Sequence, residues 1–337
     1  MNLSTSTSNR MNLLTGATGL LGSHIAEALT ARGERVRALV RPGSDVAFLR
    51  QLGVELVEGD LLEPASLPKA MGDANIVYHC AARVGNWGTK KEFRIDIVDT
   101  TRNLLQACAA GRVGRVLYVS SLSVYGHPRE PRNGWLTEDE PFCQRPGMLD
   151  HYCRAKAEAE RLAREYGRDI TIVRPSWIYG PRDRNGFPRL VHALRDRWVS
   201  IVGSGDNPLN IVYAADVADG AIRAANCPEA RGRVYHLSSE GEITQRQFFD
   251  LLTDGLGLPR INKHVSPRLA WFGGLLGELI ARGLRWRRSP HVTCYGMSLL
   301  TRSTKFSIAR AKTELGWQPQ VNPQDGLKRT LDWYLGT

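Results

Sequence analysis

Hydrophobic and polar positions in the first half of the chain alternate between short apolar runs and longer amphipathic stretches. The short runs predict strands, whereas the amphipathic stretches have the spacing of helices. We expect strands at residues 11–15, 35–40, 54–58, 76–80, 116–120 and 170–173, and helices at residues 20–32, 98–110 and 152–166. Strands that alternate with helices form right-handed crossovers, which build a parallel sheet covered on both faces. The predicted fold class is therefore α/β, a doubly wound parallel sheet.

The pattern becomes less regular after about residue 179. Proline and glycine interrupt the chain, and segments such as residues 203–208 are typical of loops. We expect this half to form a smaller C-terminal lobe over the carboxyl ends of the strands, where open α/β sheets bind ligands. The predicted organisation is a disordered lead-in (1–10), a sheet domain (11–180 with returning segments near 211–238) and a substrate-binding lobe made mainly of 181–337.

A glycine-rich segment, TGATGLLG, lies between the first predicted strand and the first predicted helix. Glycines without Cβ atoms allow a tight turn and a close approach to a pyrophosphate, and the helix N-terminus adds positive potential. Such a turn also occurs without a ligand, but its place between a strand and a helix favours a Rossmann-type dinucleotide site. The residues expected to bind the dinucleotide here are Gly16, Thr18, Gly19, Leu20, Leu21 and Gly22.

The end of the second predicted strand distinguishes between the two nicotinamide dinucleotides. A carboxylate there would hold the ribose hydroxyls of NAD(H) and repel the 2′-phosphate of NADP(H). The chain has Arg41 at this point, with Arg35 and Arg37 nearby, and an arginine can pair with a phosphate. The plain alternative is a solvent-facing arginine at a strand end. We favour NADP(H) over NAD(H), and we expect Asp60 and Leu61, after the third strand, to contact the adenine.

Tyr152 and Lys156 are four residues apart and therefore share one face of the last predicted helix. A phenol with a pKa of ~10 is a poor proton shuttle at neutral pH, and an adjacent ammonium would lower that pKa by roughly 1–3 units. Such a pair is also common on helix surfaces without any role. Residues 120–125 follow the fifth strand and residues 174–181 the sixth, so both lie at the sheet edge where a nicotinamide would bind. The combination predicts hydride transfer coupled to proton transfer.

Composition is that of an ordinary globular protein, with 42% hydrophobic and 23% charged residues. Six scattered cysteines without metal-ligand spacing predict reduced, mostly buried thiols and no metal site. No apolar run reaches the ~20 residues that span a bilayer, and residues 1–10 lack the core of a signal peptide. We therefore expect a cytoplasmic protein.

The net charge of +11 comes mainly from arginines spread along the chain, with one local concentration at Arg282, Arg285, Arg287 and Arg288. A solvated basic surface, attraction to an anionic cofactor and attraction to a membrane surface would each account for this charge. We do not expect nucleic acid as a partner, because no recognised binding module accompanies the charge.

The chain resembles the extended short-chain dehydrogenases/reductases, a superfamily of NAD(P)-dependent epimerases, dehydratases and reductases. The resemblance runs from about residue 12 to the C-terminus and is carried by TGATGLLG, Asp60-Leu61, HCAA at 79–82, SSLSVYG at 120–126, YCRAK at 152–156, RPSWIYGP at 174–181 and LGWQP at 315–319. It implies that Tyr152 is the catalytic acid/base, Ser121 the catalytic hydroxyl and Lys156 their partner. It places the cofactor against Tyr152, Lys156, Ala81, Ala82, Pro175 and Ser176, and it implies a homodimer that packs two helices per subunit.

Two departures separate the chain from other members of this superfamily. Dehydratases carry Asp-Glu where this chain has Leu122 and Ser123, and nucleotide-sugar enzymes usually carry Arg-Asp where it has Leu209 and Asn210. The loop at 81–88 and the region from 290 to 319 instead resemble 3β-hydroxysteroid dehydrogenases, sterol 4-carboxylate 3-dehydrogenases, 2-alkyl-3-oxoalkanoate reductases and dihydroflavonol reductases.

This resemblance implies an NADP(H)-dependent oxidoreductase that interconverts a secondary alcohol and a ketone. Its expected substrate is bulky and largely apolar, either sterol-like or long-chain. A nucleotide-sugar epimerase or reductase is one alternative. A non-catalytic NADP(H)-sensing protein on the same fold is the other.

Two segments leave alternatives open. Asp96 and Asp99 stand where relatives usually have Asn and Gly, and carboxylates there would alter hydrogen bonding or substrate choice. Residues 269–280 form the most apolar stretch and precede the arginine cluster, so the 269–288 region would suit peripheral contact with a membrane. We favour the other interpretation, a packing helix whose apolar side lines the substrate pocket, because its glycines weaken a free-standing helix.

Overall fold

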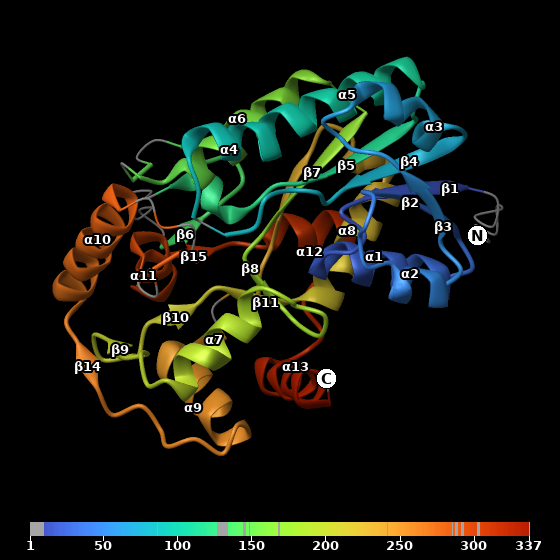
Figure 1. Ribbon diagram of the computed structural model, residues 1–337. Coiled ribbons are helices and arrows are strands. Elements are labelled where there is room, and N and C mark those ends of the chain that lie inside the picture. The colour runs from blue at the N-terminus through green and yellow to red at the C-terminus, as the bar shows by residue number, and fades with distance from the viewer. Residues whose placement is uncertain are drawn as a thin grey trace.

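The structure is a computed structural model (Figure 1). It describes residues 10–336 except for 86, 127–133, 144–145, 148, 168, 241, 285, 287–288, 291–292 and 302–303. Most of the expected lead-in (1–9), Asn86 of the 81–88 loop, and Arg285, Arg287 and Arg288 of the arginine cluster therefore lie outside the described residues.

A seven-stranded sheet with the order β12-β7-β5-β4-β1-β2-β3 forms the centre of the molecule, and all its neighbouring strands are parallel. Its members are β1 (Met11–Thr15), β2 (Arg35–Val40), β3 (Glu55–Glu58), β4 (Ala74–His79), β5 (Arg115–Val119), β7 (Ile170–Pro175) and β12 (Val234–Leu237). The first six match the strands expected from the sequence, and the doubly wound α/β fold is confirmed. The second half of the chain contributes the seventh, β12, at the edge beside β7.

Helices cover both faces of this sheet (Figure 1). One face packs on α1 (Leu20–Ala31), α2 (Ala47–Gln51), α8 (Ala214–Asn226) and α12 (Ala309–Leu315). The other packs on α3 (Leu67–Met71), α4 (Lys90–Phe93), α5 (Thr100–Ala110) and α6 (His151–Glu165), with a π-helical turn (Arg94–Asp99) leading into α5. The expected helices at 20–32, 98–110 and 152–166 correspond to α1, α5 and α6.

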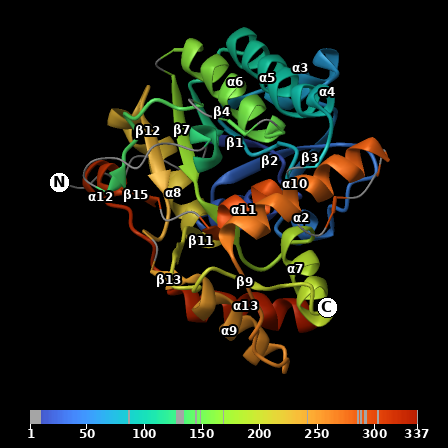
Figure 2. The same cartoon turned by 90° about the vertical axis from the view of Figure 1, so that its left-hand side faces the viewer.

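A smaller lobe with its own apolar core lies beyond the carboxyl end of β7. Its helices are α7 (Gly186–Arg195), α9 (Gln245–Gly255), α10 (Pro267–Gly283), α11 (Cys294–Thr301) and α13 (Pro323–Gly336). Its short strands are β8 (Trp177–Tyr179), β9 (Ile201–Val202), β10 (Pro208–Leu209), β11 (Ile211–Tyr213), β13 (Ile243–Thr244) and β14 (His264–Val265). The two views show these elements gathered on one side of the sheet (Figures 1 and 2).

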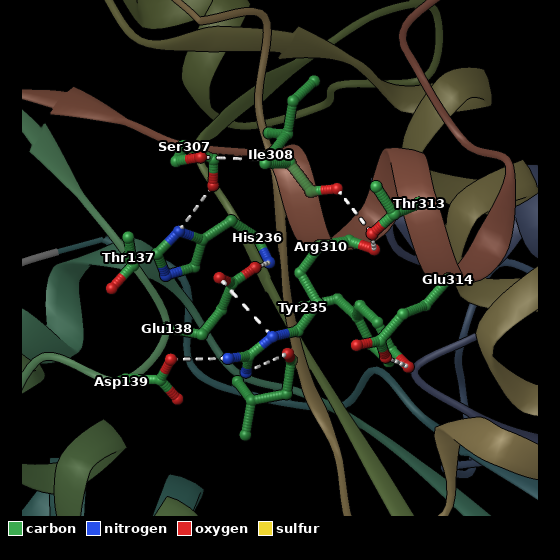
Figure 3. A network of polar contacts seen from close by, with 12 residues as sticks. Thr137, Glu138, Asp139, Tyr235, His236, Ser307, Ile308, Arg310, Thr313 and Glu314 are labelled. Carbon is green, nitrogen blue, oxygen red and sulfur yellow. Dashed lines mark hydrogen bonds and ion pairs between the residues drawn. The ribbon is translucent and has the colours of Figure 1, made fainter.

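The C-terminal region returns from the lobe to the sheet and is fixed there by polar contacts (Figure 3). In that region β15 (Lys305–Phe306) pairs with β6 (Trp135–Leu136). Arg310 of α12 donates to Asp139 at 2.7 Å, and the backbone N–H of His236 in β12 donates to Glu138 at 2.8 Å. Further along, Trp317 is buried and its indole N–H donates to the carbonyl of Asp216 in α8 at 2.9 Å. Segments far apart in sequence thus cover the edge strand of the sheet.

The structure corrects one expectation about the cysteines. All six are free thiols, but only Cys108 and Cys153 are buried and the other four are half-buried. Among the described residues, no helix combines the length and apolar character needed to cross a membrane.

Candidate active site

At two positions, Gly16 and Gly22, the turn between β1 and α1 leaves no room for a Cβ atom. Gly16 adopts a φ of +71°, and a Cβ added to it would lie 2.7 Å from the backbone nitrogen of Ala81. A Cβ on Gly22 would lie 2.8 Å from the Cα of Ala17, and one on Gly19 would lie 3.2 Å from the carbonyl oxygen of Gly16. The chain therefore passes tightly from β1 into α1, against the segment that follows β4.

The N-terminus of α1 is suited to bind an anion. Gly19 is its N-cap residue and supplies no side-chain cap, and the first turn has no acidic residue. Its first N–H groups and the positive end of its dipole are therefore available to bind a phosphate. Thr18 and Leu20 are half-buried at this turn, whereas the side chain of Leu21 belongs to the apolar core and would leave only its backbone for the cofactor.

Arg41 lies at the end of β2 with an exposed side chain and forms no ion pair with another described residue. The nearby carboxylate of Asp45 is paired with Arg184 at 2.6 Å, so its charge is balanced. After β3, Asp60 accepts the N–H of Leu62 at 2.9 Å, and Leu61 is buried.

The other two arginines of β2 are not available to a cofactor phosphate. Arg37 is buried and bonds Glu55 at 2.7 Å and Asp73 at 3.0 Å, and Arg35 pairs with Asp73 at 3.4 Å. Both lie in the first half of the strand, away from its carboxyl end. Their basic side chains stabilise the β2–β3 region instead.

Ser121, Tyr152 and Lys156 come from two neighbouring elements of the sheet domain. Ser121 follows β5 and accepts the backbone N–H of Ser123 at 3.1 Å and its hydroxyl at 2.9 Å. The Asp150 carboxylate caps α6 by accepting the N–H of Cys153 at 2.9 Å, which places Tyr152 in the first helical turn. The hydroxyls of Ser121 and Ser123 lie close enough to the phenol of Tyr152 to act on its pKa, which both of them lower. The structure therefore brings the predicted hydroxyl and phenol together.

The expected lowering of the Tyr152 pKa is wrong in this structure. Burial raises that pKa to about 12, although the hydrogen bonds from Ser121 and Ser123 oppose the rise. The Lys156 ammonium donates to the Val119 carbonyl at 3.0 Å. Burial also lowers the pKa of Lys156 to about 8, because an apolar surrounding disfavours its charged form. Desolvation is thus the largest cause of both shifts, and the charge of Lys156, on which the expectation relied, is not among the causes acting on Tyr152.

A buried polar network supports this site, and the sequence did not point to it. Glu160 follows Lys156 by one turn of α6 and accepts the Ser120 hydroxyl at 2.7 Å and Arg174 Nε at 3.0 Å. Arg174 also donates to the Tyr125 hydroxyl. Two features of the sequence could have indicated this network: Glu160 lies four residues after Lys156, and Arg174 begins the RPS segment. The pairing itself could not be predicted, because it joins α6 to β7.

His79 forms a second buried link, at the end of β4. Its imidazole bridges the hydroxyls of Thr15 at 2.7 Å and Thr101 at 3.1 Å. Burial, with a further contribution from the charge of Lys156, lowers the pKa of His79 to about 3, so the ring is neutral. It ties the glycine turn to α5 and carries no charge into the site.

Ser176 provides a test of whether the site fits a nicotinamide. Its backbone N–H donates to the Leu237 carbonyl at 3.0 Å, directly after Pro175 ends β7. Its Oγ is buried and has no hydrogen-bond partner among the described residues. A buried hydroxyl without a partner is costly unless a ligand satisfies it. Together with the glycine turn, this hydroxyl fits a bound dinucleotide whose carboxamide lies at Ser176.

Two aromatic rings flank Tyr152, and two ion pairs hold the π-helical turn that follows Phe93. Phe93 lies 6.2 Å and Tyr295 of α11 5.9 Å from the Tyr152 ring centroid. In the π-helical turn, Asp96 pairs with Arg83 of the 81–88 loop at 2.8 Å and Asp99 pairs with Arg102 at 2.6 Å. The two unusual carboxylates therefore bind arginines, and Asp96 anchors the loop that follows Ala81 and Ala82.

Comparison with known proteins places this geometry in a family. Residues 12–238 match the NAD dependent epimerase/dehydratase family. The chain belongs to this family. It is an NAD(P)-dependent enzyme of the extended short-chain dehydrogenase/reductase type, as the resemblance implied.

Relatives within the NAD dependent epimerase/dehydratase family include several oxidoreductases. The chain is 30% identical to 2-alkyl-3-oxoalkanoate reductase of Stenotrophomonas maltophilia, covering 94% of this chain and 97% of the relative. It is 34% identical to sterol demethylase protein B of Methylococcus capsulatus, covering 91% and 93%. Among solved structures, UDP-glucuronic acid 4-epimerase from Bacillus cereus in complex with NAD matches with a TM-score of 0.73, 22% identity and coverage of 97% and 99%. This last similarity concerns the fold alone.

Proposed function

We propose that the protein is an NADP(H)-dependent oxidoreductase that interconverts a secondary alcohol and a ketone on a bulky, largely apolar substrate. The observation that carries the proposal is the meeting of the Ser121 hydroxyl with the Tyr152 phenol beside buried Lys156. The dinucleotide supplies or accepts the hydride when it is bound. The protein side chains supply the proton, orient the carbonyl and exclude water.

Each of the three side chains has a separate role in this proposal. Tyr152 delivers the proton to the ketone oxygen during reduction and removes it during oxidation. Ser121, which Ser123 holds in place, donates a hydrogen bond to that oxygen. Lys156 stabilises the phenolate that reduction leaves behind and holds the nicotinamide ribose. General acid–base catalysis of this kind contributes roughly 10²–10⁴-fold.

NADP(H) is the proposed cofactor. Arg41 offers an exposed guanidinium at the end of β2, and Arg184 balances the charge of the neighbouring Asp45. We assign the pyrophosphate to the Gly16–Gly22 turn, the adenine to Asp60 and Leu61, and the nicotinamide to Ala81, Ala82, Pro175 and Ser176.

The substrate class is inferred from the residues around the site and from the relatives. Leu122 and Ser123 replace the acids of dehydratases, and Leu209, which replaces the arginine of nucleotide-sugar enzymes, is buried in the core of the lobe. Phe93 and Tyr295 present rings beside Tyr152. The relatives named above are a reductase of alkyl oxoalkanoates and a sterol demethylase protein. These observations support a sterol-like or long-chain ketone.

The test is NADPH oxidation with steroid ketones and long-chain 2-alkyl-3-oxoalkanoates, run in parallel with UDP- and dTDP-sugars. Tyr152→Phe should reduce kcat at least about 100-fold, because the general acid is removed. Tyr166→Phe makes the same change just after α6 and should retain activity. Turnover of Tyr152→Phe within a few-fold of wild type would contradict the assigned roles, and activity on nucleotide sugars alone would contradict the substrate class. The expected homodimer stays a prediction.

A further inference from the structure

Helix α10 packs against the rest of the protein through its smallest side chains. Its buried positions are Ala270, Gly274, Glu278 and Ala281, which recur every three or four residues along one side. A Cβ added to Gly274 would lie 3.3 Å from backbone atoms of residues 293–294, so α10 approaches the start of α11 closely. An ordinary surface helix buries its bulky apolar residues. In α10 the small side chains are buried instead.

The bulky apolar side chains of α10 face solvent. Six of them are about half exposed or more: Leu269 (63%), Trp271 (50%), Phe272 (59%), Leu276 (48%), Leu279 (50%) and Ile280 (49%). Leu284 (65%) and Trp286 (52%) continue the same exposure beyond the helix end. In Figure 2, α10 faces the viewer on the outside of the molecule. The expectation that this apolar side lines the substrate pocket is therefore wrong, and a contiguous exposed patch of this kind marks an interaction site.

The charge of the surrounding segment indicates what covers this patch. Residues 263–305 contain eight Lys and Arg but a single acid, Glu278. Glu278 is buried, accepts the N–H of Cys294 at 2.7 Å and feels the charge of Arg282, so its carboxylate is turned away from solvent. Of those cations, Lys263, Arg268 and Lys305 are described and exposed, and none of the three forms an ion pair with another described residue. Arg282 is described as well, but its Nε and Nη2 are buried. The acids elsewhere in the chain nearly balance the remaining bases, so most of the +11 net charge lies in this segment.

We propose that the exposed face of α10 docks onto the surface of an anionic lipid bilayer. Half-exposed leucines, Phe272 and two tryptophans would enter the boundary between headgroups and acyl chains. The basic residues that flank the helix would contact anionic headgroups, and each such cation would add to the attraction. The helix would lie along the interface, as expected for an apolar face with basic ends.

The docking face is connected to the catalytic site by direct contacts. Arg282 donates to the Gly88 carbonyl at 3.2 Å and lies 4.9 Å from the Trp87 ring centroid. Behind α10, Tyr295 of α11 contacts the Tyr152 ring. The proposed function gives the protein an apolar substrate. On that basis, the substrate would pass from the bilayer to Tyr152 beside these elements. The docking proposal is argued from the surface of α10 alone and does not depend on which substrate the enzyme uses.

The experiment is co-sedimentation of the full chain with vesicles of phosphatidylcholine and phosphatidylglycerol in equal parts, without substrate or cofactor. Wild-type protein should bind these vesicles and bind pure phosphatidylcholine at least about tenfold more weakly. Leu276→Asp should weaken binding to the anionic vesicles about tenfold or more, because an apolar contact is replaced by a charge. Leu335→Asp makes the same change at a 54% exposed leucine of α13 and should bind like wild type.

Three results would overturn the proposal. Wild-type protein that stays in solution with anionic vesicles would show that this face does not bind lipid. An equal loss in Leu276→Asp and Leu335→Asp would show a general effect of added negative charge. A vesicle-independent dimer that Leu276→Asp dissociates, without vesicle binding, would show that a second copy covers the face. Phe272→Asp must reproduce the result of Leu276→Asp, and since both residues are exposed, neither change should lower the melting temperature.

Discussion

Replacing Glu160 with glutamine should destabilise the protein strongly, although it changes only one atom. The side chains of Glu160 and Arg174 are both 0% exposed. One carboxylate oxygen accepts Ser120 and Arg174, and the other accepts Arg174 and Arg164. An amide nitrogen cannot accept these hydrogen bonds, so the guanidinium of Arg174 would stay buried without a compensating charge.

Breaking a buried ion pair in this way costs about 3–5 kcal/mol. That is a large part of the ~5–15 kcal/mol by which a typical domain is stable. We therefore expect the free energy of unfolding of Glu160→Gln, measured by urea denaturation at pH 7, to fall by about 3–5 kcal/mol. Glu158→Gln is the matched control on the same helix. Glu158 pairs with Arg94 at 3.5 Å, and the two side chains are 44% and 54% exposed, so its loss should cost less than about 1 kcal/mol.

The effect should also depend on pH. Burial alone would raise the pKa of Glu160, but hydrogen bonds from Arg174 and its charge outweigh burial and hold that pKa below the ordinary 4.5. A carboxyl with a lowered pKa in the folded state stabilises the protein above its unfolded pKa and loses that contribution as pH falls. The stability difference between wild type and Glu160→Gln should therefore be constant above about pH 5 and shrink as pH falls below about 4.5. A Glu160→Gln protein within about 1 kcal/mol of Glu158→Gln at pH 7 would refute the reasoning.

Three further predictions concern the cofactor, the catalytic lysine and the C-terminal region. Arg41→Asp should raise the NADPH dissociation constant about tenfold or more in a fluorescence titration, because it replaces a phosphate partner by a like charge. Arg50→Asp, at another exposed position, should leave that constant unchanged, and tighter binding of NADH than of NADPH by wild type would contradict the assignment. Because burial lowers the pKa of Lys156 to about 8, its ammonium is lost as pH rises through that value. The kcat/KM for reduction should fall there, and a profile that stays flat across this range would show that the charge is not needed. Trp317→Ala should lower the free energy of unfolding, measured by calorimetry, by about 3–5 kcal/mol, because Trp317 is buried. Trp198→Ala, at a 61% exposed tryptophan, should lower it by less than about 1 kcal/mol. Similar losses in both variants would mean that burial of Trp317 contributes little.

Local sequence accounts for the elements on which the cofactor site is built. The sheet strands β1 to β5 and β7 and the helices α1, α5 and α6 were predictable because each carries its own periodicity. The glycine turn was predictable as well, because Gly16 and Gly22 lie where a Cβ would collide with backbone atoms. Such constraints act between residues close in sequence, apart from the contact with Ala81.

Contacts between segments that are distant in sequence could not be predicted from local periodicity. A return of residues near 211–238 to the sheet domain was expected, but the four-residue strand β12 within them was not, because its pairing with β7 joins distant parts of the chain. Nothing near Arg37 indicates that Glu55 and Asp73 would bind it. The pKa values of Tyr152 and Lys156 depend on how deeply other elements bury them, and desolvation is the largest cause of both shifts.

The sequence by itself determined the doubly wound fold and the glycine turn, and it pointed to Ser121, Tyr152 and Lys156 as the side chains to which we assign the chemistry. Only the tertiary structure decided which arginines remain exposed, how burial shifts the pKa values in the site, and which side of α10 faces outward. The physical reason is that backbone periodicity and glycine geometry are local, whereas burial and charge pairing depend on residues tens or hundreds of positions away. For α10, the same apolar residues are compatible with a pocket wall and with an outer surface. The packing of Ala270, Gly274 and Ala281 against the lobe selects the outer surface.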